Sequence, residues 1–219
     1  MNKQCTKAVI FDMDGVLVDS EPMYFEIERY LFSYFKVNVS KEQHEALVGT
    51  SLENMWEKLI KDNNLKQSKE KIVDYHKKYV IKHVEGLREL LPTKNIKELL
   101  EDLKEKDIKI GLASSSPKDL INIILNKLNI KKFFQIIVSG DEVEKSKPHP
   151  EIFIKVAQLL NVAPNECVVI EDSSNGVNAA VAAGMKCIGF SNPHSGKQNL
   201  ENADIIINEF PNISSYLDI

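Results

Sequence analysis

Residues 9–20 read VIFDMDGVLVDS, an apolar run that stops at two carboxylates and a glycine. A short, nearly continuous apolar run is typical of a buried strand in a parallel sheet, and residues 8–11 fit this pattern. Asp12 then lies at the carboxyl end of the predicted strand. Because residues i and i+2 of an extended chain point the same way, Asp12 and Asp14 can face one small volume, and Gly15 lets the backbone turn away sharply.

Two carboxylates in one small volume repel each other, and a divalent cation is one way to relieve that repulsion. Two other interpretations fit the same residues. Asp12 and Asp14 could simply form a turn and cap a helix, as aspartates often do. The pattern Asp-x-Asp-Gly also opens calcium-binding loops. This stretch alone leaves the three interpretations open, and the rest of the chain has to decide between them.

Length and composition limit the classes of protein that need to be considered. A chain of 219 residues can form one well-buried domain, or one domain that carries a smaller insertion. The net charge is -4 and the lysines are scattered, so no basic stripe indicates a nucleic-acid partner. No stretch resembles a signal peptide or is long enough to cross a bilayer, so no membrane partner is expected. The three cysteines lack metal-ligand spacing, which favours a reduced, cytoplasmic protein. We take a monomer as the default.

The segment after Ser20 has helical periodicity, and no convincing strand occurs before about Val84. Trp56 lies in this segment and is expected in its core rather than in a ligand site. The predicted helices of this block cover residues 24–31, 44–48, 52–60 and 72–80.

From Thr93 onward, predicted strands and helices alternate strictly. This alternation implies right-handed crossovers and an α/β fold with a doubly wound, mostly parallel sheet. The predicted strands are residues 108–113, 134–138, 167–170, 186–190 and 205–207, and the predicted helices are residues 96–103, 120–128, 152–160 and 175–183.

Polar residues follow several of these strands, at the edge where a doubly wound sheet binds its ligands. The second strand leads into Ser114 and Ser115 before a helix, which favours phosphate binding, although a serine there can also serve as a plain helix cap. Another strand ends in Glu171 and Asp172. Lys147 precedes a proline in a stiff loop. Together with Asp12 and Asp14, these residues predict a phosphoryl-transfer site with a carboxylate nucleophile, an acid/base, a metal and phosphate-binding groups.

Four motifs of this chain resemble those of the haloacid dehalogenase (HAD) superfamily: FDMDGVLVDS, ASSS, SKPHP and VIEDS, in that order. The resemblance covers essentially the whole chain. The helical block is similar to the cap domain of the branch that contains beta-phosphoglucomutase and sugar-phosphate phosphatases. The resemblance implies a Rossmann-like core of residues 1–19 and 87–219 and a helical cap of residues 20–86.

The same resemblance implies a mechanism through an aspartyl-phosphate. Asp12 would attack phosphorus, and Asp14 would protonate the leaving alcohol and then activate water. The groups that would bind the phosphoryl oxygens are Ser114, Ser115 and Lys147. The residues that would hold Mg²⁺ are Asp12, the backbone carbonyl of Asp14, and Asp172, with Glu171 as a further ligand or as the partner of one.

Two positions bear on whether the activity is hydrolysis or isomerisation. In this family, the mutase has a histidine on the first cap helix and an arginine in the cap loop. Tyr24 and Leu52 stand at these positions here, and leucine cannot bind a second phosphate as arginine does. The presence of Asp14 argues against a dehalogenase.

We therefore predict a phosphatase acting on a small phosphorylated metabolite, with a sugar phosphate favoured. The alternatives are a beta-phosphoglucomutase-type isomerase and, from a different class, a non-catalytic sensor of a phosphorylated metabolite. Gly49, Thr50 and Ser51 either form a loop that closes over the substrate or simply separate two helices. Closure would bend the chain near residues 18–21 and 84–87.

Overall fold

The computed structural model describes residues 5–47, 50–210 and 216–217. In this part of the chain, six strands form one parallel sheet in the order β3-β2-β1-β4-β5-β6. The chain fills the sheet on one side of β1 and then crosses to the other, which confirms the predicted doubly wound α/β fold. The strands are β1 (Ala8–Phe11), β2 (Lys109–Ser114), β3 (Ile136–Ser139), β4 (Cys167–Glu171), β5 (Lys186–Phe190) and β6 (Ile205–Ile207).

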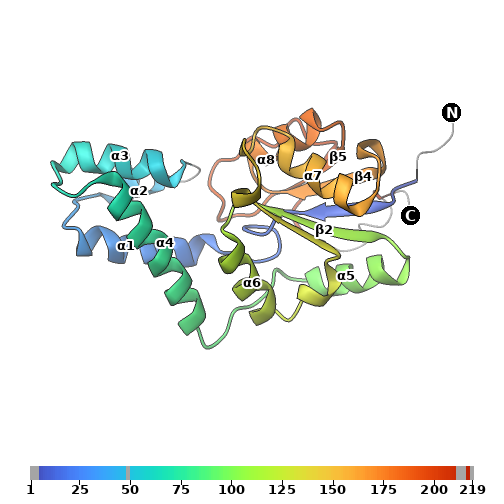
Figure 1. Ribbon diagram of the computed structural model, residues 1–219, viewed down its shortest axis with the longest axis horizontal. Helices are drawn as coiled ribbons and strands as arrows, with labels where there is room; N and C mark the ends of the chain where they lie inside the picture. The colour runs from blue at the N-terminus through green and yellow to red at the C-terminus, as the bar shows by residue number, and fades with distance from the viewer. Residues whose placement is uncertain (1–4, 48–49, 211–215, 218–219) are drawn as a thin grey trace.

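Helices cover both faces of the sheet (Figure 1). Every residue of β1 is fully buried because alternate side chains enter different cores. Val9 and Phe11 pack on the side of α5 (Ile96–Glu105) and α6 (Lys118–Lys127), whereas Ala8 and Ile10 pack on the side of α7 (Glu151–Leu160) and α8 (Ser174–Ala182). Short 3₁₀ turns connect some elements. These turns are η1 (Lys131–Phe133), η2 (Gly140–Glu142) and η3 (Pro164–Glu166).

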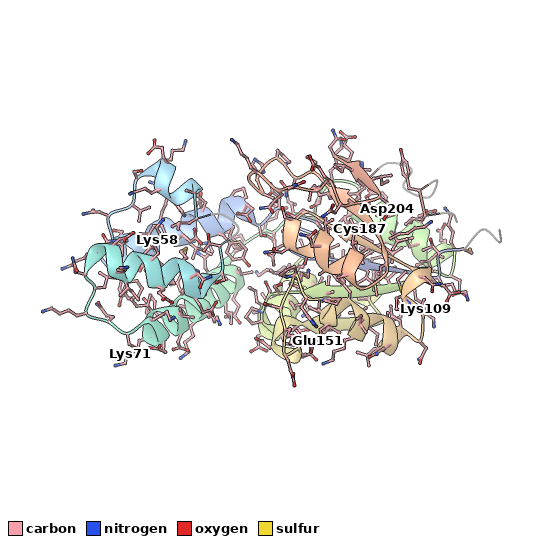
Figure 2. All side chains as sticks on the ribbon, turned by 90° about the horizontal axis from the view of Figure 1, so that it is seen from above. Lys58, Lys71, Lys109, Glu151, Cys187 and Asp204 are labelled. Atoms are coloured by element: carbon pink, nitrogen blue, oxygen red, sulfur yellow. The ribbon has the colours of Figure 1, made fainter. Side chains whose placement is uncertain are left out.

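The chain between β1 and α5 folds into a separate helical block, beside the sheet in Figure 1. Seen from above in Figure 2, Lys58 and Lys71 of this block lie on the left, whereas Lys109 and Asp204 lie in the right-hand part of the molecule. No helix in the described residues is both long and apolar enough to cross a membrane. The helices of the block are α1 (Glu21–Tyr34), α2 (Lys41–Glu45), α3 (Leu52–Asn63) and α4 (Lys69–Gly86).

The predicted helix over residues 44–48 was misplaced. Helix α2 begins at Lys41 because Ser40 and Gln43 form a reciprocal capping box, and it ends at Glu45. The prediction relied on apolar periodicity, which the polar first turn of α2 does not show. Val48, the last residue of the predicted helix, lies outside the described residues.

The core of the helical block is built around Trp56, as predicted. Its side chain is fully buried, and its ring packs edge-on against Phe32 and Phe35 at centroid distances of 5.8 and 5.4 Å. The indole Nε1 donates a hydrogen bond to Nδ1 of His76 over 3.1 Å. His76 must therefore be neutral at this nitrogen, and burial lowers its pKa to about 4.

We expect the fold to lose stability in mild acid because of His76. The unfolded histidine takes up a proton near its ordinary pKa of 6.5, whereas the folded one does so only near 4. The stabilisation by the neutral ring is therefore complete above pH 6.5 and falls as the pH drops toward 4. Between pH 7 and pH 5, the free energy of unfolding should fall by roughly 2 kcal/mol. Denaturant unfolding followed by fluorescence of Trp56, the single tryptophan, measures this loss.

The control is His76→Gln, which can still accept a hydrogen bond but does not titrate in this range. We expect this variant to lose less stability than the wild type between pH 7 and pH 5. An equal loss in both proteins would assign the acid sensitivity to other groups.

Candidate active site

The predicted site residues outside the helical block meet at the carboxyl edge of the sheet. The backbone N–H of Asp12 donates to the carbonyl of Ile170 over 3.0 Å, which aligns the end of β1 with the end of β4. Asp172 directly follows β4, and Ser114 is the last residue of β2. Parallel pairing thus brings residues from distant parts of the sequence to one edge.

Asp12 forms a buried ion pair with Lys147. Nζ of Lys147 lies 2.6 Å from Oδ1 of Asp12, and the two side chains are only 6% and 10% exposed. Among the described residues, no donor contacts Oδ2 of Asp12. One carboxylate oxygen is therefore fixed by a charge-assisted hydrogen bond, and the other remains available as a nucleophile.

Lys147 is itself held by three acceptors. Besides Asp12, its Nζ donates to Oε1 of Glu171 over 2.7 Å and to the carbonyl of Ala113 over 3.0 Å. The ammonium also lies 4.9 Å from the centroid of the Phe153 ring. Burial alone would lower the pKa of Lys147, but the carboxylates of Asp12 and Glu171 outweigh it and raise that pKa, so the ammonium stays charged.

Glu171 is oriented toward this lysine. Its Oε2 accepts hydrogen bonds of 2.9 Å from both the backbone N–H and the hydroxyl of Ser173. Gly176 in α8 makes room for it, since a Cβ there would overlap the carboxylate. Both oxygens of Glu171 thus already accept hydrogen bonds. This arrangement suits a residue that orients a metal ligand better than a residue that binds the metal itself.

The Asp14 carboxylate points toward the helical block. Its Oδ1 accepts hydrogen bonds from the hydroxyls of Ser20, at 2.8 Å, and Tyr24, at 3.3 Å. Its Oδ2 accepts one from the hydroxyl of Ser116 at 2.8 Å. Burial, followed by the nearby charge of Asp14, raises the pKa of Tyr24 well above its usual value, so its hydroxyl stays protonated and donates. Asp14 is therefore held apart from the ion pair of Asp12 and Lys147.

The carboxylates at this edge of the sheet together carry more negative charge than the single ammonium of Lys147 balances. Burial raises the pKa of Asp12 well above its usual value; Lys147 opposes this, while Glu171, Asp172 and Asp14 add to it. Burial and the charge of Glu171 likewise raise the pKa of Asp172 to about 7. A cation beside Asp12 and Asp172 would relieve both effects.

The carboxylates at this edge of the sheet suit Mg²⁺ better than a metal whose ligands all come from protein side chains. No group of three or more His, Cys, Asp or Glu side chains that could hold a metal occurs in the described part of the chain. Mg²⁺ is usually bound by one or two carboxylates, with water and substrate phosphate completing its shell. Asp12 and Asp172 supply two such carboxylates.

The other predicted residues differ in how they are placed. The Ser114 side chain is buried, and its Oγ accepts a hydrogen bond of 3.1 Å from the N–H of Ser116. Ser115 is exposed. In the predicted cap loop, Ser51 begins α3 by accepting a hydrogen bond of 3.3 Å from the N–H of Asn54. The N–H of Thr50 donates to the carbonyl of Leu47 over 3.0 Å, and Gly49 lies outside the described residues.

Residues 9–190 match the family model of the haloacid dehalogenase-like hydrolases. The chain belongs to this family. The Thermotoga maritima phosphorylated carbohydrates phosphatase is 38% identical over 185 residues, which is 83% of each chain. The Escherichia coli hexitol phosphatase B is 32% identical over 185 residues, covering 83% of this chain and 82% of that protein. The prediction of a phosphatase-type hydrolase of the HAD superfamily is thereby confirmed.

A solved structure supports the same placement. The beta-phosphoglucomutase from Clostridium difficile superimposes with a TM-score of 0.77 at 30% identity, over 97% of both chains. This HAD hydrolase therefore resembles the predicted branch of the family in both sequence and fold.

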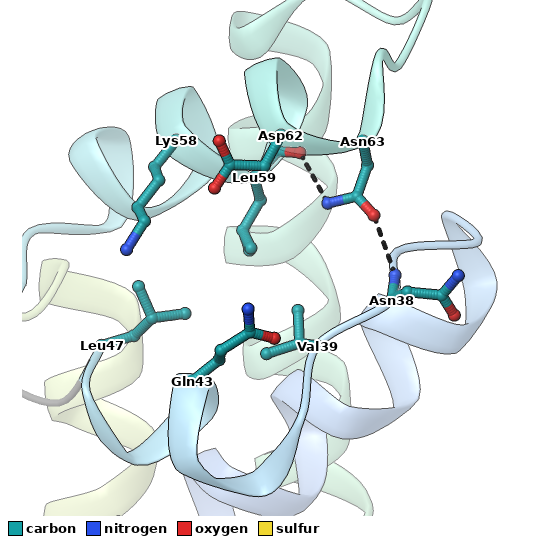
Figure 3. Close-up of a pocket in the computed structure, with 8 residues that line it drawn as sticks. All are labelled: Asn38, Val39, Gln43, Leu47, Lys58, Leu59, Asp62 and Asn63. Atoms are coloured by element: carbon teal, nitrogen blue, oxygen red, sulfur yellow. Dashed lines mark hydrogen bonds between the residues drawn. The ribbon is translucent and has the colours of Figure 1, made fainter.

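A separate cavity lies within the helical block and contains none of the predicted site residues. It has a volume of about 340 Å³ (Figure 3). Its polar wall is internally bonded, since Nδ2 of Asn63 donates to the carbonyl of Leu59 over 3.0 Å and Oδ1 accepts from the N–H of Asn38 over 3.0 Å. The lining residues are Asn38, Val39, Gln43, Leu47, Lys58, Leu59, Asp62 and Asn63.

Sequence reasoning did not assign several residues that contact the site carboxylates. Ser20 and Ser116 lie inside the quoted motifs, and their membership of these motifs is the available signal. The sequence marks Tyr24 only as the residue at the position of the mutase histidine. Ser195, whose hydroxyl donates to Oδ2 of Asp172, lies more than 20 positions beyond it and carries no local signal.

Proposed function

We propose that this HAD hydrolase is a Mg²⁺-dependent phosphatase that acts on a small phosphorylated carbohydrate through an aspartyl-phosphate on Asp12. The observation that carries the proposal is the buried Asp12–Lys147 pair, with one oxygen of Asp12 fixed and the other unoccupied. A carboxylate in this position can attack phosphorus, provided that nearby positive charge keeps it ionised.

Asp14 is proposed as the acid and then the base. As Oδ2 of Asp12 bonds to phosphorus, the bond from phosphorus to the leaving oxygen breaks, and Asp14 supplies the proton to that oxygen. Asp14 then takes a proton from water, which attacks the aspartyl-phosphate, releases inorganic phosphate and restores Asp12. The hydrogen bonds from Ser20, Tyr24 and Ser116 support this role because they hold the Asp14 carboxylate away from Lys147.

Mg²⁺ would be held by Asp12, Asp172 and the Asp14 backbone carbonyl, and when bound it would neutralise charge on the phosphoryl oxygens. Lys147 would add a second positive charge on the same side. The Ser114 hydroxyl meets no acceptor among the described residues, so its proton is available to a phosphoryl oxygen. Ser115 remains a candidate for the same contact through its hydroxyl or backbone.

The helical block of residues 20–86 is proposed as a cap that opens and closes over the site. The support is that Tyr24, on α1, reaches Asp14 in the core. The hinges would lie near residues 18–21 and 84–87, where the chain enters and leaves the block. Gly49, Thr50 and Ser51 remain candidates for the loop that faces the substrate.

The substrate class rests on the relatives, which are named for phosphorylated carbohydrates and hexitols. A beta-phosphoglucomutase-type isomerase is the second candidate because of the similarity to the Clostridium difficile enzyme. Two residues favour hydrolysis. Tyr24, and not a histidine, contacts Asp14, and the apolar Leu52 at the start of α3 offers no charge to a second phosphate.

The test is turnover by the purified protein, with and without Mg²⁺, on a panel of sugar and sugar-alcohol phosphates. Inorganic phosphate and isomerised product are followed separately. Phosphate release without isomerisation supports the phosphatase, and conversion of beta-glucose 1-phosphate to glucose 6-phosphate supports the mutase. A complete lack of turnover across the panel would favour the phosphometabolite sensor.

We expect Tyr24→Phe to lower kcat about fivefold. The variant keeps the ring but removes the 3.3 Å hydrogen bond to Asp14, and a bond of this length that shares its acceptor with Ser20 contributes about 1 kcal/mol. Steady-state kinetics at saturating Mg²⁺ measures the change. Tyr30→Phe makes the same chemical change on an exposed part of α1 and should leave kcat unaltered. Equal rates for the two variants would show that the Tyr24 hydroxyl does not influence Asp14.

A further inference from the structure

The loop after β5 reaches back to the site and contacts Asp172. The Ser195 hydroxyl donates a hydrogen bond to Oδ2 of Asp172, and the two residues are only 4% and 7% exposed. A donor to one carboxylate oxygen fixes the plane of the group and favours its ionised form. The contact therefore determines how Asp172 presents its other oxygen.

Asp172 is also confined by Gly15, which lies against the same carboxylate oxygen as Ser195. This glycine has a φ of +78°, and a Cβ at its position would overlap the Asp172 carboxylate and lie 3.0 Å from Oγ of Ser195. The carboxylate thus packs against both the turn that follows Asp14 and the hydroxyl of Ser195. It has little freedom to rotate unless one of these two contacts is removed.

Ser195 is itself held in place by the loop, defined here as residues 191–199. Nδ2 of Asn192 donates to the carbonyl of Gly15 over 3.0 Å and to Asp19 over 3.3 Å. Nδ1 of His194 lies 2.6 Å from the other oxygen of Asp19. The carbonyl of Ser195 accepts from Nε2 of Gln198 over 3.0 Å. The loop is therefore tied to the turn at residues 15–19, and Ser195 does not depend on its own side-chain contact for its position.

From this arrangement we infer that Ser195 is a positioning residue for magnesium, because its hydroxyl holds the Asp172 carboxylate in the orientation that binds the ion. The inference rests on the proposed function, since it takes Asp172 as a Mg²⁺ ligand. It assigns to the loop after β5 a role in metal affinity. Ser195 does not touch the reacting phosphate in this role and acts through Asp172 alone.

The test measures binding of Mg²⁺ alone, without substrate, from the rise in unfolding midpoint with Mg²⁺ concentration. Removing a hydrogen-bond partner of a metal ligand typically weakens metal affinity by about 10-fold to 100-fold, and we expect Ser195→Ala to fall in the lower part of this range. The Mg²⁺ concentration for half-maximal turnover should rise by the same factor, with the substrate KM at saturating Mg²⁺ unchanged. Ser191→Ala removes an exposed hydroxyl from the same loop and should bind Mg²⁺ as the wild type does.

Asp172→Asn separates failure of the inference from failure of the proposed site. If Asp172→Asn loses the response to Mg²⁺ but Ser195→Ala keeps the wild-type affinity, the role of Ser195 is overturned and the metal site stands. If Asp172→Asn responds as the wild type does, the metal site is wrong as well. Should Ser195→Ala fail to fold, Ser195→Thr, which retains the hydroxyl, decides the question. A folded threonine variant with wild-type affinity supports the inference, and one with weakened affinity overturns it.

Discussion

We expect Asp12→Asn to abolish turnover, with kcat lower by a factor on the order of 10⁴ or more, because an amide cannot form the acyl phosphate. The folded protein should persist. The ammonium of Lys147 keeps its ion pair with Glu171 in this variant, so no buried charge is left without a partner. Burial and the neighbouring carboxylates raise the pKa of Asp12, so a neutral side chain relieves repulsion at this position. In buffer without Mg²⁺, the unfolding midpoint of the variant should be no lower than that of the wild type. Steady-state phosphate release and thermal unfolding together measure both effects.

Asp119→Asn is the matched control for this experiment. It makes the same substitution at an exposed residue in the first turn of α6 and should retain both activity and stability. Turnover by the Asp12→Asn variant at a rate near that of the wild type would rule out Asp12 as the nucleophile. A large drop in the unfolding midpoint would instead mean that the carboxylate has a structural role. The loss of activity would then reflect a damaged fold and not a missing nucleophile.

The fold could be predicted largely from local patterns because its central strands are buried on both faces. The run at residues 8–11 is apolar throughout, and the structure has β1 over those residues. Helix ends were less accessible to sequence reasoning. The polar first turn of α2 depends on the side-chain bonds of Ser40 and Gln43, which apolar periodicity does not register.

The candidate site likewise contains residues that the sequence predicts and residues that it does not. Asp12, Asp14, Lys147 and Asp172 stand at strand ends or in a stiff loop, and the parallel topology alone brings such positions together. Ser195 and Tyr24 could not be inferred in this way. Each reaches a site carboxylate from a segment whose path depends on tertiary packing, namely the loop after β5 and the helical block. The residues that orient the carboxylates were therefore harder to predict than the carboxylates themselves.

We expect Lys147→Met to lower both activity and stability. The substitution keeps a long side chain against Phe153 but removes the only ammonium that contacts Asp12 and Glu171 among the described residues. Removing one partner of a buried ion pair costs about 3–5 kcal/mol, because the remaining charge stays buried without compensation. For a chain of this size, that loss lowers the unfolding midpoint by roughly 10 °C. Activity should fall about 10²-fold to 10³-fold, as expected when a donor to the transferred group is lost.

Lys145→Met, at an exposed position of the same loop, is the control and should change neither quantity. The two effects of Lys147→Met should respond differently to Mg²⁺. A divalent ion beside Asp12 would compensate part of the buried charge, so saturating Mg²⁺ should restore some of the lost midpoint. The proposed contribution of Lys147 to phosphate binding would stay absent, so activity should stay low. If Mg²⁺ restored neither the midpoint nor the activity, the ion would not be binding next to Asp12. If it restored both, Lys147 would serve only to balance charge, and its contact with the phosphoryl group would have to be abandoned.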